Sequence, residues 1–269
     1  MNSAASDKCQ PGFTLVELLV SLGIFLLVIG AAFTLLGSSQ NRYQTESQVL
    51  TSFQEARLGL DQIVRDVNDA GYPPPSYVST NFNLFTITPF AWSPGYAGNN
   101  PCVIGTLGGG TCATPGDFDL IIETNPNPQD PACAPSCQVQ WIRYKLETPP
   151  TVPVPTLMRG VVLKQFNADP AAAFAGANAP APFVQNVVNS PAQPIFSYTC
   201  DTSTAPQLPP LPCAPLGDPN TAAAVDNSPA NIRDVMINLI VATPQRDATT
   251  GQPRVVELRG RGRRINPNQ

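Results

Sequence analysis

One carboxylate stands alone in the most apolar stretch of this sequence. Residues 13–36 are 24 residues that carry a single charged side chain, Glu17. A carboxylate inside an apolar membrane helix costs about 2.5–3.5 kcal/mol on insertion scales, so such a residue generally has a function and a partner. Glu17 is therefore the first residue of this chain for which we expect a chemical role.

The composition excludes most catalytic chemistry. The 269 residues contain no histidine, which removes Ser–His and Cys–His catalysis and the commonest metal ligand. No acidic pair stands out, and the aspartates at Asp130, Asp218 and Asp226 lack the spacing of a calcium-binding loop. We expect a protein that is not an enzyme, with no cofactor, no bound metal and no small-molecule substrate. The net charge of −4 gives no reason to expect nucleic acid as a partner.

The cysteines have the pattern of an exported protein. One of the seven, Cys9, precedes the apolar stretch, and the other six follow it. An even set is typical of disulfides, whereas a metal cluster would call for histidine or C-x-x-C pairs. The sequence leaves the pairing open, but local clustering favours three couples: Cys102–Cys112, Cys133–Cys137 and Cys200–Cys213. Each bridge would close a loop that has little core of its own.

The apolar stretch is long enough to cross a bilayer, which takes about 20 residues of helix. A secretory signal is a poor match, because the leader offsets Lys8 with Asp7, the run is too long and no small-residue cleavage site follows it. A lipoprotein signal places its cysteine after the apolar run, whereas Cys9 comes before it. A plain membrane anchor leaves Glu17 unexplained.

Residues 37–71 continue as a predicted amphipathic helix. Gly71 and the proline run 73–75 end it. A continuous helix from residue 13 to residue 70 would be about 87 Å long at about 1.5 Å per residue. Its apolar face is formed by residues that recur at steps of three and four: Leu50, Phe53, Ala56, Leu60, Ile63, Val67 and Ala70.

The remainder, residues 72–269, is predicted to be a β-rich domain, since the chain has 31 prolines, 19 glycines and only 13% charged residues. Hairpins with Pro/Gly connections predict an antiparallel sheet packed on the helix, an α+β fold, with Gly160 as a candidate bulge. Of the long loops, 166–193 has no cysteine couple and is the expected disordered segment. Runs of β-branched and aromatic residues predict strands at 82–88, 117–124, 138–146, 156–164, 194–198, 235–241 and 254–259.

The segment Gly12-Phe13-Thr14-Leu15-Val16-Glu17 closely resembles the class III signal of type IV prepilins and type II secretion pseudopilins. The resemblance implies cleavage after Gly12 by the prepilin peptidase and N-methylation of Phe13. It also implies that Glu17, the fifth residue of the mature chain and one helical turn from the first, pairs with the terminal amine of a neighbouring subunit.

The same resemblance implies the type IV pilin fold, in which a long N-terminal helix packs on an antiparallel β-sheet; here disulfides would staple the long loops. The expected organisation is a cleaved leader (1–12), a transmembrane half-helix (13–36), an amphipathic half-helix (37–71) and a globular domain (72–269). The chain would cross the inner membrane once, with its leader cytoplasmic and its globular domain periplasmic, and would then move into a pilus at the cell surface.

A second and looser resemblance joins residues 55–72 with the runs 141–146, 157–159 and 235–241, which are similar to PilW-type minor pilins and GspJ-type minor pseudopilins. It implies a structural minor pilin that takes part in type IV pilus assembly, initiation or tip formation. The implied partners are other major and minor pilins, the prepilin peptidase, the inner membrane and the pilus assembly platform.

Two alternatives stay open. The same helix would serve a minor pseudopilin of a type II secretion system. A membrane-anchored adhesin or DNA-uptake module is the other alternative, since a basic cluster can bind phosphates, although a solvated tail after the last strand is the simpler explanation. The cluster holds five of the fifteen Lys and Arg residues: Arg254, Arg259, Arg261, Arg263 and Arg264.

Overall fold

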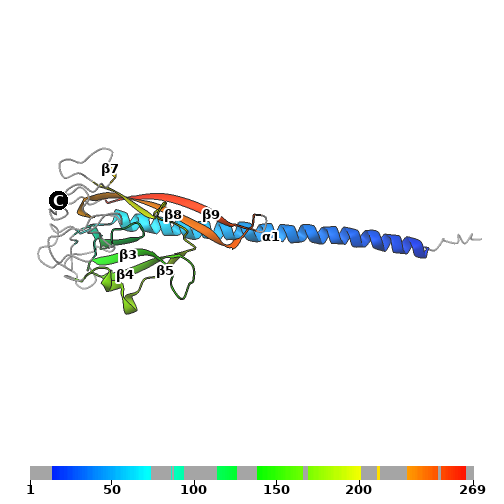
Figure 1. Ribbon diagram of the computed structural model, residues 1–269, viewed down its shortest axis with the longest axis horizontal. Helices are drawn as coiled ribbons and strands as arrows, with labels where there is room; N and C mark the ends of the chain where they lie inside the picture. Colours follow the sequence, from blue (N-terminus) through cyan, green and yellow to red (C-terminus); the bar gives the residue numbers. More distant parts are fainter. Residues whose placement is uncertain are drawn as a thin grey trace, which may run out of the picture.

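The main element of the fold is one long helix, α1 (Leu15–Asn68), of 54 residues and about 81 Å at about 1.5 Å per residue. The computed structural model describes residues 14–73, 86, 88–93, 114–125, 138–165, 169–200, 211–212, 229–247 and 250–264. Thr14 caps the helix at its start, and Gly71, with φ of 82°, follows its end. In Figure 1, the N-terminal half of α1 projects from the molecule and strands cover its C-terminal half. The predicted long N-terminal helix is confirmed.

Two antiparallel sheets flank the C-terminal half of α1. The first has the strand order β1-β2-β3-β4-β5 and consists of β1 (Phe90–Ala91), β2 (Asp119–Thr124), β3 (Gln140–Glu147), β4 (Thr156–Leu163) and β5 (Ala181–Gln185). The second has the order β7-β6-β8-β9 and consists of β6 (Phe196–Cys200), β7 (Leu211–Pro212), β8 (Ile232–Arg246) and β9 (Pro253–Arg263). Short 3-10 helices are η2 (Ala172–Phe174), η3 (Gly176–Asn178) and η4 (Pro229–Asn231). The α+β class is confirmed, with two sheets in place of one.

A second sheet can pack because α1 is buried on two faces. A Cβ atom added at Gly262 of β9 would lie 2.5 Å from Val67 Cγ1, so glycine lets this strand approach the helix closely. On another face, a Cβ atom at Gly59 would lie 2.5 Å from Val184 Cγ2 of β5. Of the two hydrophobic clusters among the described residues, the larger joins the helix and both sheets, and its fully buried members include Ala56, Ile63, Leu120, Ile142, Val184, Phe196, Val235 and Leu239.

The segment expected to be disordered, 166–193, is ordered from residue 169 onward, so that prediction is wrong. Residues 169–178 place the ring of Phe174 over β4, and β5 then pairs with β4. Beyond β5, the side chain of Asn189 accepts a hydrogen bond from Ile240 N at 2.9 Å and donates one to Asn238 O at 2.8 Å. These contacts fix a segment whose composition shows no strand pattern.

Two details of the strand predictions are also corrected. The β3–β4 pairing is regular through Gly160, and the irregularity of β4 lies at its pairing with β5, between Leu157 and Met158. Glycine is needed at position 160 because an added Cβ would lie 2.8 Å from the Phe174 ring. Of the strand predicted at 82–88, only residues 86 and 88 are described; neither lies in a strand, and β1 begins at Phe90.

Candidate processing and assembly site

The first turn of α1 holds the carboxylate of Glu17 in a capping box with Thr14. Glu17 Oε2 accepts hydrogen bonds from Thr14 N and Thr14 Oγ1, each at 3.0 Å. In return, Glu17 N donates to Thr14 Oγ1 at 3.3 Å. This arrangement satisfies two of the N–H groups that a helix start leaves free, and it places a negative charge where the helix dipole is positive.

The carboxylate therefore lies beside the backbone nitrogen that follows Phe13. Gly12 and Phe13 lie outside the described residues, so cleavage between them and methylation of Phe13 stay predictions, as does the assembly role of Glu17. The geometry does show that Glu17 folds back toward the start of the helix and not outward along it. A positive group placed at the start of α1 would meet this carboxylate.

The apolar half of α1 has no cover within the described chain. Residues 14–28 are all exposed, and the most apolar window of the helix has a mean hydropathy of 2.6 with none of it buried. By length and composition, this is a helix that can cross a membrane. Monomeric soluble proteins rarely expose so large an apolar surface, and such a surface is typical of one that contacts a membrane or another protein.

The buried half of α1 is tied to the first sheet by an acidic residue that the sequence analysis did not single out. Asp66 Oδ2 accepts a hydrogen bond from the Tyr144 hydroxyl at 2.6 Å and one from Arg159 Nη2 at 2.9 Å. Asp66 Oδ1 accepts from Gln62 Nε2 at 2.7 Å. Burial raises the pKa of the Tyr144 hydroxyl, and the Asp66 carboxylate raises it further, so the tyrosine stays a donor at all ordinary pH values.

Two more ion pairs lie on the opposite side of the first sheet. Lys164 Nζ contacts Glu123 Oε1, and both side chains are fully buried. Asp119 receives two hydrogen bonds from Arg143, from Nε at 2.9 Å and from Nη2 at 2.6 Å. Burial raises the pKa of Asp119 and the arginine opposes that rise. The Arg143–Asp119 pair connects the neighbouring strands β3 and β2, and the Lys164–Glu123 pair reaches across β3 from the end of β4 to β2, so we assign both pairs to the scaffold.

Arg254 and Arg259 lie in β9, as the strand predicted at 254–259 requires. The strand continues through Arg261 and Arg263, so the expectation of a solvated tail after residue 259 is wrong for these two. Three arginines are paired with carboxylates of the β8–β9 hairpin: Arg254–Asp247 (2.7 Å), Arg259–Glu257 (2.7 Å) and Arg261–Asp234 (2.8 Å). Their charge is therefore largely neutralised within the hairpin, which weakens the case for an extended nucleic-acid-binding surface along β9.

Of the six cysteines expected to form disulfides, Cys200 is the one that the structure describes. It ends β6, is buried, and is disulfide-bonded. Its predicted partner Cys213 lies outside the described residues, directly after β7, which pairs with β6. The remaining predicted couples lie outside the described residues: Cys102–Cys112 and Cys133–Cys137.

One of three comparisons with known proteins, a family model, matches the N-terminal region that contains Glu17. A solved type IV-like pilin from Thermus thermophilus is 12% identical to this chain, with 80% of this chain and 97% of that chain covered and a TM-score of 0.37. None of the curated proteins matches the sequence. The family model for the prokaryotic N-terminal methylation motif matches residues 7–33. The chain therefore carries the N-terminal methylation motif of type IV pilins, and Gly12, Phe13 and Glu17 all lie within it.

Proposed function

We propose that this protein is a minor pilin, a structural and non-enzymatic subunit that is built into a type IV pilus through its long helix. The observation that carries the proposal is the fully exposed apolar half of α1, which begins with a capped carboxylate inside the methylation motif. Lipid would cover this surface before assembly, and the helices of other subunits would cover it afterwards.

Processing would prepare the start of the helix for assembly. Cleavage after Gly12 by the prepilin peptidase would leave Phe13 as a methylated, positively charged amine, one residue before the Thr14 nitrogen that Glu17 already binds. In the unassembled chain, the capping box keeps the carboxylate hydrogen-bonded. In the filament, Glu17 would exchange these bonds for an ion pair with the amine of a neighbour, which is stronger in an apolar bundle than in water.

The rest of the fold would hold the exposed half of α1 in a fixed direction. The ion-paired Asp66 and the glycine contacts of β9 fasten the other half of the same helix between two sheets. The globular domain would then face outward, periplasmic before assembly and at the cell surface afterwards. Partners would be other pilins and the assembly platform of the inner membrane.

Two substitutions separate the charge of Glu17 from its capping function. Glu17→Gln keeps an amide oxygen that can accept the Thr14 N–H, but it removes the negative charge. Thr14→Val removes the hydroxyl of the capping box but keeps the carboxylate. Incorporation of each variant into sheared pili would be measured by immunoblot in the native host, with the membrane fraction as the measure of insertion.

We expect Glu17→Gln to insert normally and to lower incorporation by more than about tenfold, because breaking a buried ion pair costs about 3–5 kcal/mol. Thr14→Val should assemble nearly normally. The proposal fails if Glu17→Gln reaches filaments at wild-type level, or if Thr14→Val and Glu17→Gln are equally impaired, since that result would assign Glu17 to capping alone.

A further inference from the structure

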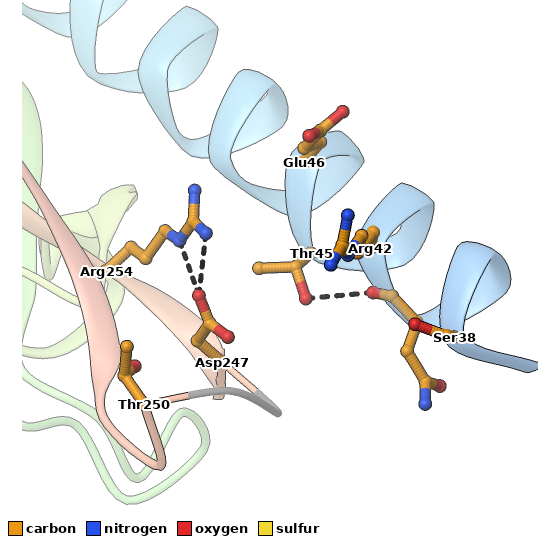
Figure 2. Close-up of a pocket in the computed structure, with 8 residues that line it drawn as sticks. Ser38, Arg42, Thr45, Glu46, Asp247, Thr250 and Arg254 are labelled. Atoms are coloured by element: carbon orange, nitrogen blue, oxygen red, sulfur yellow. Dashed lines mark hydrogen bonds and ion pairs between the residues drawn. The ribbon is translucent and has the colours of Figure 1, made fainter.

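A polar groove lies between α1 and the tip of the β8–β9 hairpin, at the point where the helix leaves the sheets. Figure 2 shows its two walls, with the helix on one side and the hairpin on the other. The hairpin is held there by a hydrogen bond from Gln48 Nε2 to Gln245 Oε1 at 2.9 Å. The groove is lined by Ser38, Asn41, Arg42, Thr45, Glu46, Asp247, Thr250 and Arg254.

The groove begins directly after the apolar half of the helix. If the hydrocarbon layer ends near Leu36, then Ser38 lies about 3 Å and Arg42 about 9 Å beyond it, at about 1.5 Å per residue. The headgroup layer on each side of a bilayer is about 5–8 Å thick. Ser38 and the lower wall of the groove therefore lie at the level of the lipid headgroups whenever α1 spans a membrane. Arg42 lies at the outer edge of that layer, and its long side chain can reach back toward it.

The groove contains two guanidinium groups, one held by a carboxylate and one exposed without a salt bridge among the described residues. Arg254 is fixed by Asp247, which receives its Nε at 2.7 Å and its Nη2 at 2.7 Å. In Figure 2 the third nitrogen of Arg254 points away from this carboxylate. Arg42 is exposed, and within the described chain it has no salt bridge. Glu46 points away from the hairpin.

We propose that this groove binds the phosphate of a phospholipid headgroup in the leaflet that faces the globular domain. Guanidinium groups match phosphate in geometry and charge, and Ser38 and Asn41 supply further donors at the lower wall. The formal charges that line the groove cancel, so binding depends on where the groove lies and on the free donors of Arg42 and Arg254.

Two exposed side chains that follow groove residues directly in the sequence fit the same environment. Tyr43 on the helix is 75% exposed and Val255 on β9 is 57% exposed. Tyrosine is enriched where membrane meets water, because its ring is apolar and its hydroxyl is polar. The hairpin thus becomes a second membrane contact, which sets the tilt of the globular domain before the subunit enters a filament. This inference rests on the proposed function only in requiring that α1 spans the membrane.

The test compares amide hydrogen exchange of the full chain in two environments: nanodiscs of phosphatidylethanolamine and phosphatidylglycerol, and maltoside micelles, which contain no phosphate. Exchange at residues 246–254 should be slower in the nanodiscs. Arg42→Gln should lower the protection factor of these amides in the nanodiscs about fivefold, the effect expected of one basic residue beside an anionic surface. Arg57→Gln is the matched control, since Arg57 is exposed on the same helix about 22 Å farther from the membrane.

Each other outcome overturns the inference in a distinguishable way. Equal exchange of the hairpin tip in both environments, with the amides of residues 15–36 protected, would refute the headgroup site and leave the spanning helix intact. Loss of protection at residues 15–36 would refute the spanning helix and both proposals with it. Protection of the tip that appears only with several chains per nanodisc would assign the groove to a neighbouring subunit.

Discussion

The contact between Asp66 and the first sheet is the part of the fold most open to a quantitative test. Asp66→Ala removes a carboxylate whose side chain is 6% exposed and leaves Arg159, 26% exposed, without its carboxylate. It also leaves the buried Tyr144 hydroxyl without the acceptor at 2.6 Å. The perturbation therefore acts on the junction that fixes the direction of α1.

The magnitude follows from these contacts. Breaking a buried ion pair costs about 3–5 kcal/mol, and the lower end applies here because water reaches part of Arg159. The higher helix propensity of alanine offsets about 0.5 kcal/mol of this loss in the free energy of unfolding. The expected loss is about 2.5 kcal/mol, which lowers Tm by about 5–10 °C for a domain of this size.

The assay is thermal unfolding of the full chain in detergent, followed by near-ultraviolet circular dichroism. Asp61→Ala is the matched control, because Asp61 is an exposed aspartate on the same helix and such surface changes stay within about 0.5 kcal/mol. If Asp66→Ala melts within 2 °C or so of this control, roughly the scatter of a surface substitution, then the junction does not depend on the carboxylate and our reasoning about the helix is wrong.

Three further predictions test other parts of the account. Gly59→Ala should cost about 1–3 kcal/mol by overpacking against β5, measured by chemical denaturation, whereas Gly37→Ala, with no atom within 4 Å of its Cβ, should cost nothing. Desolvation and the neighbouring Asp66 carboxylate raise the pKa of Asp69, so its contribution to stability is lost as pH rises above about 4, the ordinary pKa of an aspartate. Asp69→Asn should flatten this fall in thermal stability with pH, and an unchanged pH profile would contradict this. Mass spectrometry of a non-reduced digest should find Cys200 linked to Cys213, and any other partner would refute the predicted couple.

The parts of the fold that follow local periodicity were predictable. The apolar run and the stripe that follows it predicted α1 to within a few residues at each end. The alternation of Val235, Ile237, Leu239 and Val241 predicted the centre of β8 for the same reason: each of these side chains points into the core. Both strands of the β8–β9 hairpin extend beyond this centre. Their ends are set by the hydrogen-bonded pairing between the two strands, and no alternation of apolar and polar residues marks them.

The parts that depend on distant contacts were not predictable. Asp66 resembles any polar residue of a helix, and its partners Tyr144 and Arg159 lie 78 and 93 positions away. β9 runs past the predicted end into a stretch of alternating Arg and Gly because Gly260 and Gly262 let α1 approach. Nothing local in the sequence distinguishes such glycines from those of a loop.

The most direct test of the central claim is mass spectrometry of the N-terminus, with the protein made in its native host in the presence and absence of the prepilin peptidase. We predict a mature chain that starts at N-methylated Phe13 and that disappears when the peptidase is deleted. A chain that keeps Met1, or one that is cut after the apolar run, would contradict processing as a type IV pilin, because no charged amine would then lie beside Glu17.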